Sequence, residues 1–322
     1  MAVSLKPIFR AAKYAWLYKK AREKAREKSA ASAVIPTRTP PTAFIIGCGR
    51  SGTTILGQLL STHPTIRYLF EPYHLWAALD ERSDVLNLYH NGAAQLMMSA
   101  NESSDSARNT FARLFWPVDD SQMLIEKTPL NVYRIGYLQA LMPQAKFVHI
   151  VRDGVDVAHS ISRLATGSPY KIAGKPELNQ WWGVAGQKWA RLKREGAAAG
   201  YWASDVDGLK TETQKGAYEW LTSLAEMDRQ RTALGLQLHE MVYEQFIYAP
   251  EKALTQLCNF LGLSAPTDWL ESSAREIRLQ TPTPKTVDLP PAVAQAFNAY
   301  QLRYGFSQRA SIIGALAKPV PR

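Results

Sequence analysis

The feature that most constrains this chain is an apolar run ending in a glycine-rich turn, residues 44–54 with the sequence FIIGCGRSGTT. An apolar stretch follows, in which Ile55, Leu56, Leu59 and Leu60 recur at helical spacing. Glycines allow the backbone to approach an oxyanion closely, and the N–H groups at a helix start point toward it. The order therefore predicts a strand, a phosphate-binding loop and a helix.

This loop departs from that of nucleotide triphosphatases at one position. Gly47 and Gly52 match the first part of the pattern G-x-x-x-x-G-K-[ST], but Thr53 stands where the lysine belongs. In kinases and triphosphatases this lysine reaches the β- and γ-phosphates. We therefore expect a loop that binds a phosphate ester without transferring a γ-phosphoryl group.

Apolar strands and helices alternate after the loop, and this alternation predicts an α/β fold. Strands are predicted at 43–47, 66–69, 123–126, 146–152 and 238–243. Helices are predicted at 54–62, 74–100, 105–115, 132–141, 155–164, 250–261 and over most of 178–235. The pattern implies a P-loop-like parallel sheet covered by helices on both faces, with helical inserts at 74–116 and 165–235.

Charged side chains follow the predicted strands, at the sheet edge where ligands of such folds bind. These residues are Arg50, Glu71, Lys127, Arg152 and Glu244. Ser160 lies eight residues beyond Arg152, close enough for joint contact with one ligand, since a helix advances about 1.5 Å per residue. Basic residues dominate, so we expect an anionic ligand with one phosphate at the loop and a second near Arg152 and Ser160.

Several motifs in this order resemble those of the sulfotransferase superfamily. They are GRSGTT (49–54), YLFEP (68–72), EKTP (126–129), VHIVRDGVDVAHSISR (148–163) and VYE (242–244). The resemblance covers roughly residues 43–263. It is strongest to the membrane-associated branch that sulfates carbohydrates or protein tyrosines, whose members also have a glutamate at the position of Glu71. The soluble branch that acts on phenols and steroids generally uses a histidine base.

The resemblance implies a donor, 3′-phosphoadenosine-5′-phosphosulfate (PAPS), with 3′-phosphoadenosine-5′-phosphate (PAP) as its product and no metal. The residues implied to hold the 5′-phosphosulfate are Arg50, Ser51, Gly52, Thr53 and Thr54. Those implied to hold the 3′-phosphate are Arg152 and Ser160, and Tyr243 would lie near the adenine or ribose. Glu71 is implied as the general base, and Lys127 as the cation near the transferring group.

The residues alone leave structural alternatives open at this site. Glu71 precedes a proline and could cap a helix, and His74 is a rival base. Lys127 could be a solvated lysine at a strand end, Arg152 could pair locally with Asp153, and Ser160 could be an ordinary helix serine. The sequence assigns no firm role to Arg163 or to Lys285.

A tryptophan cluster in the second insert also has two interpretations. Trp181, Trp182 and Trp189 fall in a region predicted as helix. Core packing is one interpretation, and a stacking wall for a sugar or aromatic acceptor is the other. By analogy with the superfamily, the two helical inserts are expected to form the acceptor side of the site.

The predicted organisation is a basic extension and linker (1–42), a sulfotransferase domain (43–310) and a tail (311–322). The net charge is +10, and the first 22 residues contain six lysines or arginines and no acid. Residues 4–20 are amphipathic and either rest on anionic lipid or form a solvated extension. The rest is only mildly basic, which argues against nucleic-acid binding. No window reaches the roughly 20 apolar residues of a membrane span.

These observations predict an enzyme that moves a sulfuryl group onto a hydroxyl of a carbohydrate, lipid, tyrosine or metabolite. The alternative is a nucleotide kinase, a triphosphatase or a non-catalytic nucleotide-binding protein with a degenerate loop. Two cysteines far apart imply no disulfide framework and favour a reducing compartment. We therefore expect a cytoplasmic protein, with the inner membrane face as the surface that residues 4–20 would contact.

Overall fold

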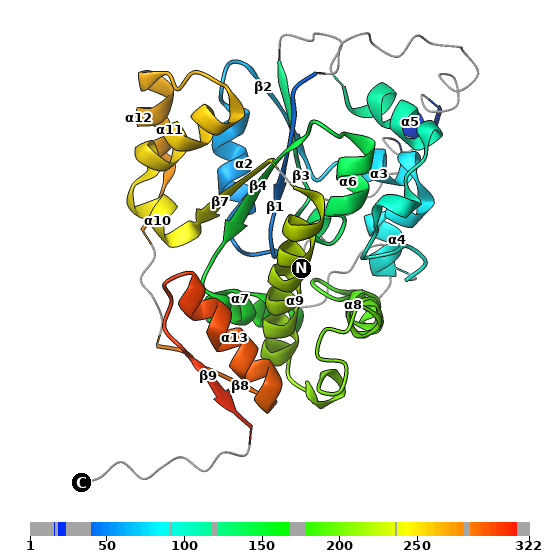
Figure 1. Cartoon of the computed structure of the whole chain (residues 1–322), viewed down its shortest axis with the longest axis vertical. Helices are drawn as coiled ribbons and strands as arrows, with labels where there is room; N and C mark the ends of the chain where they lie inside the picture. Colours follow the sequence, from blue (N-terminus) through cyan, green and yellow to red (C-terminus); the bar gives the residue numbers. More distant parts are fainter. Residues whose placement is uncertain are drawn as a thin grey trace, which may run out of the picture.

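A five-stranded parallel sheet forms the centre of the molecule (Figure 1). The computed structural model describes residues 16, 19–23, 40–90, 92–116, 122–167, 178–235, 237–279 and 284–313. The strands are β1 (Thr42–Ile46), β2 (Ile66–Phe70), β3 (Met123–Lys127), β4 (Lys146–Val151) and β7 (Gln237–Val242). Their order in the sheet is β2-β3-β1-β4-β7, with every pair parallel. The predicted strands and the α/β fold class are confirmed.

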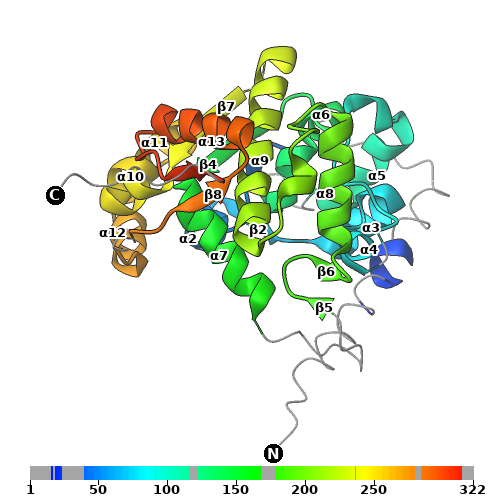
Figure 2. The ribbon, with the colours of Figure 1, turned by 90° about the horizontal axis from the view of Figure 1, so that it is seen from below.

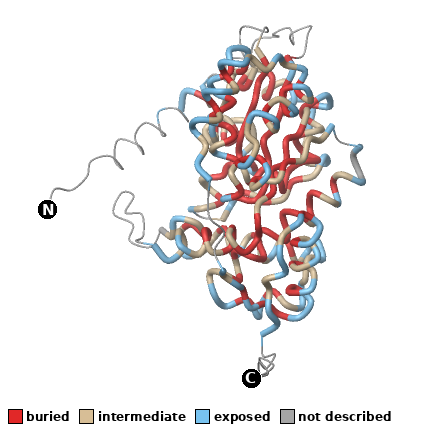
Figure 3. Tube along the Cα trace, turned by 90° about the vertical axis from the view of Figure 1, so that its left-hand side faces the viewer, coloured by how far each residue is buried: buried red, intermediate tan, exposed pale blue. Residues whose placement is uncertain are grey.

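Each face of the sheet buries its own apolar cluster, because successive side chains of a strand point to opposite faces. Ala43 and Ile45 of β1 belong to one cluster, and Phe44 and Ile46 belong to the other. Helices contributing to the first cluster are α2 (Thr53–Ser61), α10 (Tyr243–Tyr248), α11 (Pro250–Leu261) and α12 (Thr267–Glu276). Those contributing to the second include α5 (Asp105–Phe115), α6 (Ile135–Leu141), α7 (Gly154–Thr166) and α9 (Glu212–Leu234). Figure 3 shows the buried residues running through the middle of the trace.

The prediction of one helix over 74–100 is wrong. The chain forms α3 (Tyr73–Leu79), a 3-10 turn (Glu81–Ser83) and α4 (Val85–His90). Residues 92–99 are not helical, and a 3-10 turn follows at Ala100–Glu102. Asp80 accepts a hydrogen bond from the Arg82 N–H at 2.9 Å, and Asp84 accepts from the Leu86 and Asn87 N–H groups at 2.9 and 3.1 Å. Asp80 thus binds an N–H group of the 3-10 turn, and Asp84 binds N–H groups at the start of α4. Apolar periodicity alone does not reveal these breaks between helices, because they depend on single polar side chains.

The prediction of helix over most of 178–235 is confirmed, but the first residues of this stretch are not helical. The short strands β5 (Leu178–Asn179) and β6 (Gly183–Val184) pair antiparallel before α8 (Gln187–Ala198) begins. Asn179 Oδ1 accepts from the N–H groups of Trp181 and Trp182, both at 2.9 Å. This Asx turn places the two tryptophans in a connection between strands and not in a helix. Figure 2 shows β5 and β6 next to α8.

The C-terminal part closes on the start of α7. The strands β8 (Val287–Leu289) and β9 (Ala310–Ile312) pair parallel beside α13 (Pro291–Arg303). Arg309 pairs with Asp153 at 2.6 Å and with Asp156 at 3.7 Å. In the part of the chain that the structure describes, no helix is both long and apolar enough to cross a bilayer. Most of residues 4–20, predicted as amphipathic, lie outside the described residues, as does most of the tail beyond 311.

Candidate active site

The glycine-rich turn lies at the carboxyl end of β1 and leads into α2. Gly52, the N-cap of α2, has φ +96°. A Cβ atom at this position would lie 2.3 Å from the ring of Tyr243, so only glycine fits without moving that ring. No side chain caps α2, so its first N–H groups face the loop with the positive end of the helix dipole behind them.

A buried hydroxyl in this turn supports the fit to a phosphate-bearing ligand. Ser51 Oγ is buried and has no hydrogen-bond partner among the residues that the structure describes. An unpartnered buried polar atom is costly, and a phosphate oxygen at the loop would satisfy it. The donor set of hydroxyls, N–H groups and a guanidinium in residues 50–54 suits a phosphate or sulfate oxygen.

Two arginines and a serine meet beside the loop. Arg50 Nε donates to Ser160 Oγ at 3.2 Å, and Arg152 Nη1 donates to the Arg50 carbonyl at 3.3 Å. The Arg152 guanidinium lies 4.9 Å from the centroid of the Tyr243 ring. Burial lowers the pKa of Arg50 from its ordinary value, and the charges of Arg152 and Arg163 lower it further. Like charges held together in this way favour a bound anion, which would relieve their repulsion.

Asp153 has a structural part in this arrangement. Its carboxylate accepts from the N–H groups of Val155 and Asp156 at 2.9 and 3.2 Å, and so caps α7. It also pairs with Arg309, while Arg152 lies 4.0 Å from Asp156. Lys285 contributes its carbonyl to Arg309 at 3.2 Å. Asp153 therefore orients the helix that carries Ser160.

The carboxylate of Glu71 is held between Lys127 and a tyrosine. Lys127 Nζ lies 2.6 Å from Glu71 Oε1 and donates to Thr54 Oγ1 at 3.2 Å, while the Tyr73 hydroxyl donates to Glu71 Oε2 at 2.8 Å. The side chain of Lys127 is 0% exposed, so the alternative of a solvated lysine is wrong. Burial lowers the pKa of Lys127, and the charge of Glu71 opposes this shift. Glu71 has φ +42°, a strained conformation for a non-glycine residue.

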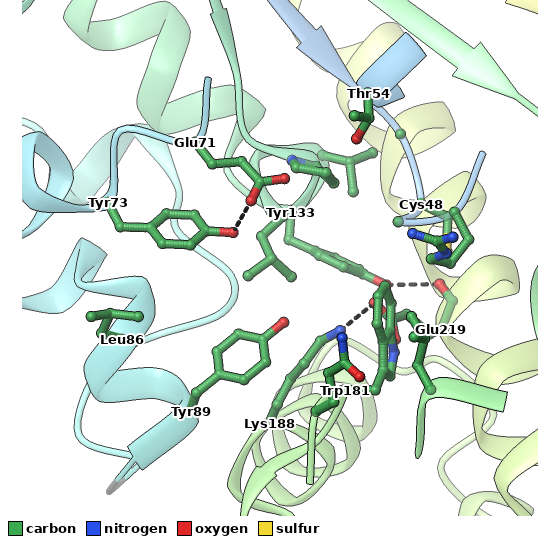
Figure 4. A pocket seen from close by; sticks show the side chains of 18 of the residues that line it. Cys48, Thr54, Glu71, Tyr73, Leu86, Tyr89, Tyr133, Trp181, Lys188 and Glu219 are labelled. Atoms are coloured by element: carbon green, nitrogen blue, oxygen red, sulfur yellow. Dashed lines mark hydrogen bonds and ion pairs between the residues drawn. The ribbon is translucent and has the colours of Figure 1, made fainter. Parts of the chain in front are cut away.

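A cavity of about 500 Å³ opens in front of Glu71 (Figure 4). Its wall is mainly aromatic and aliphatic. Two charged side chains, Lys188 and Glu219, also line it, apart from the charged residues beside the glycine-rich loop. The lining residues include Tyr73, Leu86, Tyr89, Leu130, Val132, Tyr133, Leu164, Trp181, Lys188 and Glu219. His74 is not among the described residues that line this cavity, which counts against it as the rival base.

A buried ion pair forms part of the cavity wall. Lys188 Nζ of α8 lies 2.7 Å from Glu219 Oε1 of α9, with both side chains at most 2% exposed. The indole N–H of Trp181 donates to Glu219 Oε2 at 2.7 Å. Trp181 also packs on the loop, because a Cβ at Gly49 would lie 2.4 Å from its ring. The sequence analysis missed Lys188 and Glu219.

The tryptophan cluster thus divides between its two interpretations. Trp182 is buried and its indole N–H donates to Glu212. Trp189 packs against the second apolar cluster of the sheet, the one that contains Phe44 and Ile46. Trp181 alone of the three lines the cavity. Leu86, Tyr89, Lys188 and Glu219 fall within the two inserts that the sequence assigns to the acceptor side, but no position at a strand end marked them individually. Other lining residues that the sequence did not indicate lie outside the inserts, at Tyr73, Leu130, Val132, Tyr133 and Leu164.

Comparisons with known proteins agree on one family. The family described as "Sulfotransferase family" matches residues 41–267. A protein-tyrosine sulfotransferase of Drosophila melanogaster is 29% identical over 154 residues, covering 46% of this chain and 30% of that protein. The nodulation protein NoeE of Sinorhizobium fredii is 32% identical over 131 residues, covering 38% and 31%.

Other similar proteins cover more of the chain at lower identity. A putative protein-tyrosine sulfotransferase of Caenorhabditis briggsae is 25% identical over 227 residues, covering 68% of this chain and 65% of that protein. The matched part thus spans from about a third to just under two thirds of these curated relatives. Among solved structures, a sulfotransferase domain from the curacin biosynthetic pathway aligns with TM-score 0.48 and 18% identity, over 84% of this chain and all of that one.

Proposed function

The chain belongs to the sulfotransferase family, and we propose that it transfers a sulfuryl group from PAPS to a hydroxyl group of an acceptor bound in the cavity. The observation that carries the proposal is the path of contacts from Glu71 through Lys127 to Thr54. It links a carboxylate that lines the cavity to the end of a loop suited to phosphate. A base for the acceptor and a cation for the donor would thus lie side by side at one reacting centre.

The assignment of the donor rests on the two groups of anion-binding residues. Residues 50–54 would hold the 5′-phosphosulfate, with Ser51 Oγ and the first N–H groups of α2 as donors. Arg152 and Ser160 would hold the 3′-phosphate, and the Tyr243 ring would lie along the nucleoside. A ligand with phosphates at both places fits this distribution of charge better than a nucleotide with one linear phosphate chain.

In the proposed reaction, Glu71 takes the proton of the acceptor hydroxyl while the oxygen of that hydroxyl forms a bond to sulfur. The bond between sulfur and the bridging oxygen breaks, and its electron pair stays on the 5′-phosphate of PAP. Lys127, Arg50 and the N–H groups of α2 stabilise the charge that grows there, and each such preorganised donor contributes about 3–4 kcal/mol. Tyrosine, carbohydrate, lipid and metabolite hydroxyls are the proposed acceptor classes.

Titration with nucleotides tests this proposal directly. We expect PAP to bind at least about tenfold more tightly than ATP with Mg²⁺, and its affinity to be unchanged by EDTA, because the loop lacks the lysine of triphosphatases. ADP, which has no 3′-phosphate, is the matched control. Tighter binding of ATP with Mg²⁺ would instead favour the kinase or triphosphatase alternative.

Tyr73 is expected to act as a positioning residue for Glu71. Burial and the charge of Glu71 raise the pKa of Tyr73 well above its ordinary value, so its hydroxyl remains a hydrogen-bond donor. Tyr73→Phe should lower kcat about tenfold, since it removes one hydrogen bond to a charged group. The KM for PAPS should stay the same, because Tyr73 lies away from the loop. Tyr137→Phe, a buried tyrosine of α6, is the control for packing. Unchanged kcat in Tyr73→Phe would contradict this role.

A further inference from the structure

The ion pair of Lys188 and Glu219 lies in the cavity wall but has no part in the proposed reaction. Both side chains are almost fully buried, and both line the same cavity as Glu71. Figure 4 places Glu71 and Lys188 on different sides of this space, with the hydroxyl of Tyr89 pointing toward the end of Lys188. An acceptor with its hydroxyl at Glu71 would therefore extend toward this pair.

The two charges are compensated by their surroundings. The carboxylate of Glu219 is contacted on one oxygen by Lys188 and on the other by Trp181. The ammonium of Lys188 lies 4.0, 5.2 and 5.7 Å from the ring centroids of Trp181, Trp182 and Tyr89. Removing two charges from water costs about as much as their attraction returns, so stability alone is a weak reason for a buried pair.

The balance of charge in the cavity favours one kind of acceptor. The described lining residues between Glu71 and the pair are mostly aromatic or aliphatic, as at Leu86, Tyr89 and Val132. The charges of Lys188 and Glu219 cancel each other. A charged group of the acceptor would have to be desolvated here without a free counter-charge, whereas a neutral polar group could share the hydrogen bonds of the pair.

We propose that Lys188 and Glu219 are specificity-determining residues that select an uncharged acceptor with a ring-shaped apolar body. The inference rests on the proposed function and deepens it. The aromatic wall contacts the ring, and the pair receives a neutral polar group at the far end. The balance of the two charges excludes anionic and cationic groups at that place.

The test uses three acceptors of one shape with PAPS as donor: 6-hydroxymethyl-2-naphthol, 6-hydroxy-2-naphthoate and 6-aminomethyl-2-naphthol. Wild-type enzyme should use the neutral compound with a kcat/KM at least about tenfold above both charged ones, since an unpaired buried charge costs more than 1.4 kcal/mol. Glu219→Gln should shift the preference toward the naphthoate, and Lys188→Met toward the amine. Equal use of the three compounds by wild-type enzyme would overturn the proposal.

Two further variants keep the test interpretable. The double variant Lys188→Met/Glu219→Gln removes both charges. It leaves no buried charge unpaired, so it should fold even where a single variant does not. It should still disfavour both charged acceptors. Lys193→Met, on the exposed part of α8 where Lys193 pairs with Asp207, should leave every preference unchanged. Unshifted preferences in folded single variants would also overturn the proposal.

PAP affinity, measured on the same samples, tests the proposed function separately. PAP binding without transfer to any of the three compounds rejects only the acceptor inference.

Discussion

Glu71→Gln is expected to lower turnover about 1,000-fold, the loss typical of removing a general base. The amide oxygen of glutamine can accept the hydrogen bond from Lys127, and its NH2 group can donate to the Tyr73 hydroxyl in place of the bond that the carboxylate accepts, so the site should hold its shape. It cannot accept the proton of the acceptor hydroxyl. Steady-state rates at saturating PAPS measure the effect, and calorimetry should give a PAP affinity within about twofold of wild type.

The control for this variant is Glu81→Gln, in the turn that follows α3. Glu81 has a side chain that is 76% exposed and pairs with Arg22 at the surface. It should keep full activity, because surface ion pairs contribute little. Near-normal turnover of Glu71→Gln would show that another group removes the proton.

Arg152→Gln is expected to weaken PAP binding about 100-fold. The guanidinium is half-buried between the Arg50 carbonyl and the Tyr243 ring. The substitution would remove a strong charge-assisted partner from a phosphate that binds there. The KM for PAPS should rise in parallel, whereas kcat at saturating PAPS should change little, because Arg152 is assigned to the phosphate that does not react. Fluorescence or calorimetric titration with PAP measures the loss.

Arg275→Gln, on an exposed position of α12, provides the matched loss of charge. It should leave the affinity for PAP unchanged. A second comparison uses ADP, which lacks the 3′-phosphate and should bind wild type and Arg152→Gln alike. If both nucleotides lost affinity equally, Arg152 would act on the whole loop and not on the 3′-phosphate.

The sequence predicted the parts of the site that follow from sheet geometry. Arg152 stands directly after β4, Lys127 is the last residue of β3, and Arg50 lies in the turn after β1. Parallel strands bring such positions to one edge of the sheet. The structure brings Arg50 and Arg152 into contact, and Lys127 onto Glu71. Their assigned roles remain predictions until the variants are measured.

The cavity could not be predicted in the same way. Tyr89, Lys188 and Glu219 lie on helices within the inserts, where tertiary packing and not chain order decides which face meets the site. Local side-chain capping was also missed. Asp80 and Asp84 divide the first insert, and Asn179 turns the chain so that Trp181 reaches the cavity. These contacts involve single polar side chains that leave no periodic signal.

The contact between Gly52 and the Tyr243 ring has a consequence for how such a chain can evolve. The two residues lie far apart in the sequence, yet the ring fills the space that a side chain at position 52 would need. A smaller residue at 243 would free this space, but the positive φ of Gly52 would still strain any other residue there. Glycine is therefore expected at position 52 in natural homologues even where a smaller residue replaces the tyrosine at 243.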